Sequence, residues 1–116
     1  MIQTKERDRF LADVIITAVE SGALDQWALN VYNYTWTDDP PLAAVDVLDE
    51  DHQVHHINHA TIARGIRRLL APDFEVNPEV RQWIAEDNRD NDASDIDSIA
   101  ASSIIEAAIF GSIVYC

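Results

Sequence analysis

Residues 42–70 read LAAVDVLDEDHQVHHINHATIARGIRRLL and contain the signals of two strands and a helix in close succession. The apolar, β-branched run Leu42–Leu48 is typical of a strand. A short acidic loop follows it, and a third strand is expected over Gln53–Ile57. Asn58 suits the N-cap of a helix over His59–Ala71, which a proline then ends. This stretch predicts an antiparallel hairpin that leads directly into an amphipathic helix.

The segment before this stretch, Trp27–Thr37, predicts one more strand because it is rich in aromatic and β-branched residues. Its apolar side chains change from odd to even positions near Val31 and Tyr32. Either both faces of the strand are partly covered, or a β-bulge re-aims the chain. Asp-Asp-Pro-Pro at residues 38–41 ends the strand. Since the loops have hairpin lengths, the three strands should form a meander.

Two helices are indicated outside this region. Apolar residues recur at intervals of three and four from Glu6 to Ser21, and Gly22 is placed to end that helix. Pro78 suits the first turn of another helix that runs to about Asp87.

A last helix is expected to begin after Ser94 as N-cap and to end near Phe110. Its wide apolar stripe is rich in small residues and includes Ile96 and Ile99, which favours a central, closely packed position. The tail SIVYC at residues 112–116 is expected to form a short strand or to dock on the domain. The sequence thus predicts a single α+β domain over residues 1–116, in which a small antiparallel three-stranded meander packs against about four helices.

Composition restricts the partners of this domain. The formal net charge is −13, from 21 acidic and 8 basic residues. Such a field repels nucleic acid and anionic membranes, and it attracts basic partners. The alternatives are a charge that only keeps the protein soluble, or an acidic surface that imitates DNA and occupies a nucleic-acid-binding protein. The acids from Asp38 to Asp51 and from Glu86 to Asp97 would form that surface.

The cellular location is expected to be the cytoplasm. The one cysteine, Cys116, excludes a disulfide framework within the chain. The polar N-terminus lacks the apolar core of a signal peptide, and no apolar run approaches the roughly 18 residues that cross a bilayer. We therefore expect no membrane partner.

All four histidines, His52, His55, His56 and His59, lie within eight positions. Histidine is a common transition-metal ligand, so His55 and His59 are the weak candidates for a metal site and for a small metal-dependent enzyme. On a strand, however, His55 and His56 point to opposite faces. Exposed or hydrogen-bonded histidines are the favoured interpretation, and no cofactor is predicted.

Three of the eight basic residues, Arg64, Arg67 and Arg68, fall on the side of the predicted helix away from its apolar stripe. Guanidinium groups suit phosphate or carboxylate recognition. They could instead pair with the protein's own carboxylates, such as those of residues 86–97. The aromatic residues Tyr34 and Trp36 could stack on a base, or pack against the helices.

Several blocks of this sequence resemble a family of small proteins of unknown function from actinobacteria and their phages and plasmids. The blocks are FLADVIITAVESG, TIARGIRR, NRDNDASDID and AAIFGSIVYC, together with the strand that carries Trp27 and Trp36. The chain differs from the family at Cys116, where glycine is expected. By analogy, the resemblance implies a protein of a phage or mobile element that binds a host factor, with a possible counter-defence role.

For catalysis the chain offers neither a Gly-x-Ser-x-Gly elbow nor a Gly-rich phosphate loop. The leading hypothesis is a non-enzymatic binding protein and homo-oligomer, which engages a host protein or a nucleotide-like anion. Arg64, Arg67, Arg68, Tyr34 and Trp36 are its predicted ligand-binding residues. The alternatives are the DNA mimic, the histidine-dependent enzyme and a structural protein of a virion.

Overall fold

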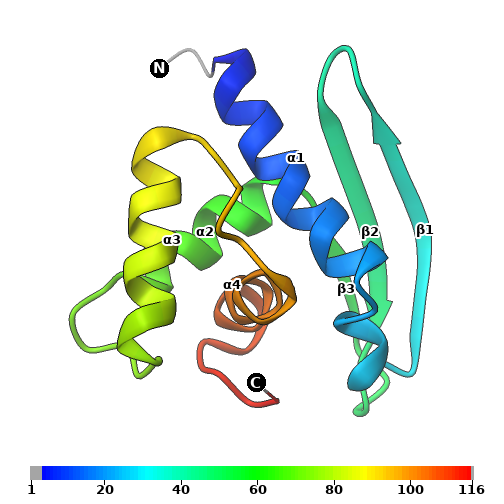
Figure 1. The fold of residues 1–116 in the computed structure, drawn as a ribbon. Helices are drawn as coiled ribbons and strands as arrows, with labels where there is room; N and C mark the ends of the chain where they lie inside the picture. Colours follow the sequence, from blue (N-terminus) through cyan, green and yellow to red (C-terminus); the bar gives the residue numbers. More distant parts are fainter. Residues whose placement is uncertain (1–3, 116) are drawn as a thin grey trace.

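The computed structural model describes residues 4–115 and has the expected α+β architecture. A three-stranded sheet forms one side of the molecule, α1 lies across it, and α4 runs between the sheet side and α3 (Figure 1). The elements are α1 (Lys5–Glu20), a short 3-10 helix η1 (Leu24–Gln26), β1 (Asn30–Thr37), β2 (Leu42–Leu48), β3 (Val54–Ile57), α2 (His59–Leu69), α3 (Pro78–Asp90) and α4 (Ser98–Phe110).

The sheet is the predicted meander, with β2 between β1 and β3 and both pairs antiparallel. The register of β1 against β2 shifts between Tyr32 and Thr35, and Asn33 within this shift has a φ of 54°. This irregularity agrees with the bulge that would re-aim the chain, and the half-burial of both Val31 and Tyr32 agrees with two partly covered faces. The strand begins later than predicted, because Trp27 lies before it at the end of η1 and is buried in the core.

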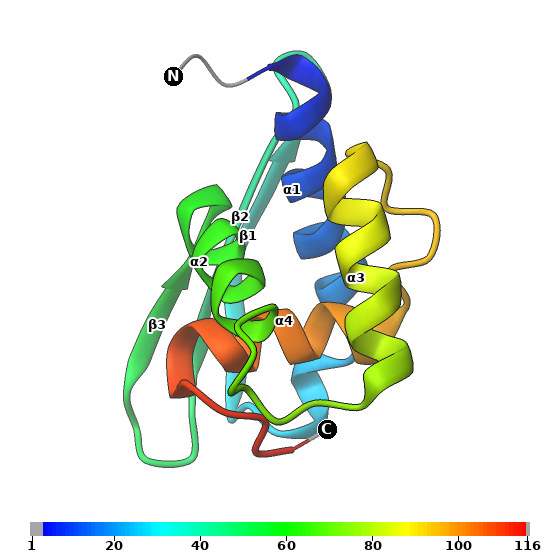
Figure 2. The same cartoon turned by 90° about the vertical axis from the view of Figure 1, so that its left-hand side faces the viewer.

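The core lies between the sheet and the helices. Val45, Val47 and Ile57 belong to this core, and all three are at most 1% exposed. Figure 2 shows the sheet on one side of the molecule and α3 on the other, with α4 between them. Every residue of α4 from Ala100 to Ala108 is buried, which confirms the predicted central position of this helix. α2 approaches α4 so closely that a Cβ added to Gly65 would lie 2.1 Å from the Ile104 carbonyl oxygen. Only glycine permits this approach.

The start of α4 differs from the prediction. Asp97, and not Ser94, is the N-cap, and its carboxylate accepts a hydrogen bond from the Ala100 N–H at 2.8 Å. The reason is a tertiary contact: the buried Asp87 carboxylate at the end of α3 accepts the N–H of Asp95 at 2.8 Å. This bond holds the preceding loop against α3. Ile99, predicted to be buried, lies in the first turn of α4 and is 56% exposed.

The segment after α4 docks and forms no strand within the described residues. Glu106, which is fully buried in α4, accepts the N–H groups of Val114 and Tyr115 at 2.9 and 2.5 Å. The Tyr115 ring stacks on Trp27 at 5.3 Å. Cys116 lies outside the described residues. Within residues 4–115, no helix is both long and apolar enough to cross a membrane.

Candidate functional site

The three predicted arginines of α2 have different surroundings. Asn58 and Thr61 form a capping box that begins the helix, and its apolar stripe turns inward. Arg68, although exposed at its end, donates from Nη1 to the carbonyl oxygens of Ala107 and Ala108 at 3.3 and 2.7 Å. These carbonyls belong to the last turn of α4, where a positive charge is favourable. Arg68 therefore has a structural partner, and that partner is a helix end instead of a carboxylate.

Arg64 and Arg67 make no ion pair and no hydrogen bond within residues 4–115. Arg64 is half-buried and Arg67 is exposed. The other six basic side chains each have a partner: Lys5 with Asp39, Arg7 with Asn88 and Asn91, Arg9 with Asp38, Arg68 with α4, Arg81 with the Phe74 carbonyl and Arg89 with Asp90. In a chain with so many acids, two guanidinium groups without any partner among the described residues are conspicuous.

Trp36 lines a cavity of about 550 Å³ at the point where β3 ends and α2 begins. The side chains of Trp36 and Leu42 are 54% and 47% exposed there, and Ala60 forms the wall on α2. Arg64 and Arg67 follow Ala60 by one and two helical turns, and therefore continue from that wall along the outer side of the helix. They lie beside the cavity and do not line it.

Tyr34, the second predicted aromatic residue, is not part of this cavity. Its hydroxyl donates to the Glu20 carboxylate at the end of α1 at 2.9 Å, and its ring packs partly buried against the core. Burial, and then the neighbouring Glu20 charge, raises the pKa of Tyr34 to about 12. The structure thus separates Tyr34 from the surface that Trp36 presents.

The histidine cluster divides into separate pairs with carboxylates. His55 bonds Asp49 at 2.7 Å, and His56 bonds Asp46 at 2.6 Å on the other face of the sheet. The Asn33 amide, which donates to Asp46 at 3.0 Å, and then His56 lower the pKa of the Asp46 carboxyl group. At Asp49 the pKa is lowered by His55 and then by the backbone N–H of residue 53.

His59, the second weak metal candidate, has partners of its own. Its Nε2 accepts the Ala43 N–H at 3.2 Å, so in the neutral ring the proton is on Nδ1, which lies 3.6 Å from an Asp8 oxygen. His55 and His59 therefore do not converge. In the described part of the chain, no three His, Cys, Asp or Glu side chains are grouped so that they could hold a metal.

The acids proposed for DNA mimicry are partly neutralised. Asp38 pairs with Arg9 at 2.8 Å, and Asp90 pairs with Arg89 at 3.1 Å. Asp46 and Asp49 contact histidines, and Asp87 is buried. Residues 38–51 and 86–97 therefore do not present an unbroken row of free carboxylates.

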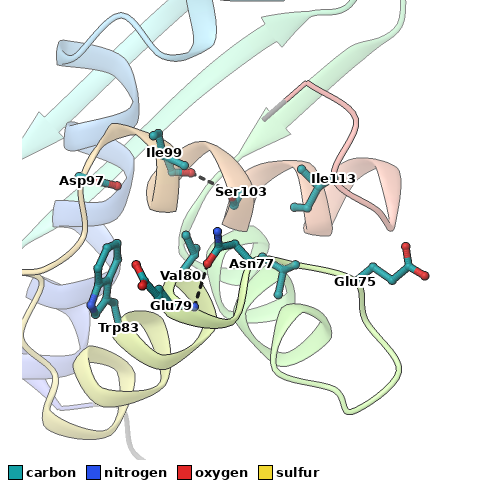
Figure 3. Close-up of a pocket in the computed structure, with 10 residues that line it drawn as sticks. Glu75, Asn77, Glu79, Val80, Trp83, Asp97, Ile99, Ser103 and Ile113 are labelled. Atoms are coloured by element: carbon teal, nitrogen blue, oxygen red, sulfur yellow. Dashed lines mark hydrogen bonds between the residues drawn. The ribbon is translucent and has the colours of Figure 1, made fainter.

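A larger hollow, of about 730 Å³, lies between α3 and the first turns of α4 (Figure 3). We call it the α3–α4 groove. Trp83 on α3 and Ile99 on α4 form its apolar walls and are 38% and 56% exposed. Ile113 of the docked tail closes one end, where Glu75 also lies, whereas Glu79 and Asp97 lie near Trp83 (Figure 3).

Sequence reasoning missed this groove. Trp83 follows the buried Val80 by three residues and precedes the buried Ile84, so helical periodicity places it at the margin of the inward stripe of α3. This marginal position is the sequence signal that could have indicated a partly exposed Trp83 side chain. Ile99 gave no such signal, because the apolar periodicity of the last helix placed it in the buried stripe.

Comparison of the chain with protein-family models, with curated proteins and with solved structures gave no match. The likeness to the actinobacterial and phage proteins therefore stays a prediction, and function is argued from the geometry of the surfaces.

Proposed function

We propose that this chain is a non-enzymatic binding protein for a nucleotide-like anion, which it takes on the outer side of α2 beside Trp36. Arg64 and Arg67 would contact phosphate oxygens, and the exposed face of Trp36 would stack on the base. The single observation that supports this most is the lack of any partner for these two guanidinium groups within residues 4–115.

The charge distribution of the molecule explains why the lack of partners for Arg64 and Arg67 matters. Arginine forks bind phosphate through paired, coplanar donors. In a protein with a net charge of −13, a guanidinium beside a carboxylate of its own chain would be neutralised before a ligand arrived. Arg64 and Arg67 are three positions apart on one helix and lie close enough to contact the same phosphate.

The cavity beside Trp36 would supply the apolar part of the site. At about 550 Å³ it falls in the range of small-molecule sites. A base that stacks on Trp36 would bury the ring surface that is now exposed, and a stack of this kind contributes about 1–3 kcal/mol per base. The distance of one to two helical turns from Ala60 to the arginines suits a ligand with a ring at one end and a phosphate at the other.

The proposal assigns no catalytic step, because the chain has no phosphate loop and no nucleophile elbow. From the resemblance described above, we also propose that the bound factor belongs to the bacterial host of a phage or mobile element. A cytoplasmic location and a homo-oligomeric state are further parts of this proposal.

A thermal-shift panel of mono-, di- and cyclic nucleotides tests the site. A ligand at a hundred times its Kd stabilises the folded state by about 2.7 kcal/mol, which is readily measured. We expect at least one nucleotide to raise the Tm of the wild-type chain, the Arg64→Ala/Arg67→Ala variant to lose that response, and Trp36→Ala to weaken it.

The matched control is Arg9→Ala/Arg89→Ala. It removes the same charge from two arginines that already pair with exposed acids. This variant should keep the nucleotide response. If no nucleotide shifts the wild-type Tm, or if the control loses the response as fully as the α2 variant, the anion site is wrong.

A further inference from the structure

The α3–α4 groove combines exposed apolar side chains with a negative rim. Trp83 on α3 and Ile99 on α4 form walls of the groove, and both are large hydrophobic residues with exposed side-chain surface. Single exposed apolar residues need no explanation, but here two of them line the same hollow of about 730 Å³ and give it an apolar wall on each helix. Tryptophan is also the residue type most enriched among the residues that dominate binding energy at protein interfaces.

The charged residues in the walls are all acidic. Glu75, Glu79 and Asp97 line the groove, and no lysine, arginine or histidine of residues 4–115 does. Within the described chain, none of these three carboxylates forms an ion pair. Asp97 caps α4, and Glu79 lies in the first turn of α3, where the helix dipole favours a negative charge. The fold therefore keeps these charges without a basic partner of its own.

We propose that the α3–α4 groove is the docking site for a basic amphipathic segment of a partner protein. One or two large apolar side chains of that segment would enter between Trp83 and Ile99. Its lysine or arginine residues would face Glu79 and Asp97 at one end and Glu75 at the other (Figure 3). This is the mode in which a short helix lays its apolar stripe into a groove.

Charge complementarity favours this occupant over others. The net charge of −13 steers positively charged proteins toward the molecule, and the three carboxylates of the groove disfavour a second copy of this acidic chain at that place. An arginine of the partner that reached the Trp83 ring would add a cation–π contact. The site differs in sign and position from the anion site on α2, so the two proposals stand or fall separately.

Selection from a random peptide library displayed on phage, with the full chain as bait, tests this docking site without a presumed partner. We expect the selected peptides to share a bulky apolar pair flanked by lysine or arginine. Synthetic versions of these peptides should bind the wild-type chain, and versions with glutamate in place of the basic residues should not bind.

Two variants locate the binding. Glu75→Gln/Glu79→Gln removes two rim charges and should weaken the peptide by about tenfold, and Ile99→Ser should do the same by shortening an apolar wall. The matched control is Glu6→Gln/Asp25→Asn, which removes two charges from exposed positions outside the groove and should change the Kd by less than about twofold. Thermal melts of each variant establish that it is folded.

Several outcomes would overturn the proposal. These are a library that yields no binder, a consensus without basic residues, or equal weakening by the rim variant and its matched control. Sedimentation of the wild-type chain and of Ile99→Ser tests for one more contradicting outcome. If the wild-type chain dimerises and Ile99→Ser is monomeric, the groove is filled by a second copy of the chain and not by a basic partner.

Discussion

The Asp87 side chain is buried, at 4% exposure, and its carboxylate accepts a hydrogen bond from the loop that precedes α4. Burial raises its pKa, the N–H of Asp95 partly offsets this, and the charges of Asp95 and Asp92 raise it further. Because the folded-state pKa lies above the unfolded one, ionisation opposes folding. The stability that Asp87 contributes is fully present only below its unfolded pKa of about 3.9, and it falls as pH rises through the folded value.

We therefore expect Asp87→Asn to be more stable than the wild-type chain at pH 7. The amide oxygen can still accept the Asp95 N–H, but it carries no charge. A rise in Tm of about 2–5 °C is the size expected for less than about 1 kcal/mol in a domain of this length. The difference should disappear near pH 3, where the wild-type carboxyl is protonated. A Tm difference that does not change from pH 3 to pH 7 would contradict this explanation.

Glu106 is the second buried acid with a structural role. Its two oxygens accept the Ser102 hydroxyl and the N–H groups of Val114 and Tyr115. Glu106→Ala leaves these donors without an acceptor and should cost about 2–3 kcal/mol in the free energy of unfolding. Urea titration measures this loss. Faster chymotrypsin cleavage after Tyr115 would show that the tail is released. The Glu106→Gln variant keeps one acceptor oxygen, so its free energy of unfolding should lie between those of the wild-type chain and Glu106→Ala.

The contact between α2 and α4 depends on Gly65. Alanine is favoured over glycine within a helix by about 1 kcal/mol, so an exposed position would gain stability from Gly→Ala. Here the new Cβ would meet the Ile104 carbonyl at 2.1 Å, and a backbone atom cannot turn aside. We expect Gly65→Ala to lower the free energy of unfolding by about 3 kcal/mol, the upper range for overpacking. Arg67→Ala on the outer side should change it by less than about 0.5 kcal/mol in the same urea titration.

The elements that the sequence predicts well are those with local signals. Asn58 caps α2, Asn77 and Pro78 begin α3, and both are found as expected. The change in parity within β1 left two explanations open, and the structure shows a register irregularity after Tyr32. In each case the deciding groups are within a few residues of one another.

The sequence-based predictions were wrong where a contact between residues distant in the sequence determines the local structure. Ser94 has the composition of an N-cap, but the bond from Asp95 to Asp87 moves the helix start to Ser98. Ile99, which the apolar stripe predicted to be buried, lies in the wall of the α3–α4 groove. Periodicity alone could place Arg64 and Arg67 on the outer side of α2. It could not show that Arg68 reaches across to α4, because that requires the packing of the two helices.

For the molecule as a whole, the two candidate surfaces have opposite local charge. The outer side of α2 offers two unpaired guanidinium groups, whereas the α3–α4 groove offers three carboxylates without ion pairs in the described residues. A net charge of −13 assists a basic partner at the groove and opposes an anion at α2. Added salt should therefore weaken peptide binding at the groove more than it weakens nucleotide binding.

The same net charge makes the fold itself dependent on ionic strength. The molecule measures 35 × 34 × 25 Å, and the Debye length is about 30 Å at 0.01 M salt and 10 Å at 0.1 M. At low salt nearly all the acids therefore repel one another, whereas at 0.3 M only close neighbours do. Surface pairs such as Lys5–Asp39 lose a little from this screening, but each is worth less than about 1 kcal/mol.

We expect the Tm at pH 7 to rise by about 4 °C or more between 0.01 and 0.3 M NaCl, which corresponds to about 1 kcal/mol in a domain of this size. The control is the same salt series near pH 4.3, the isoelectric point of the sequence, where the net charge is close to zero and the rise should vanish. An equal rise at both pH values would assign the effect to the salt itself. A fall at pH 7 would mean that attraction within local ion pairs outweighs the repulsion among the unpaired acids.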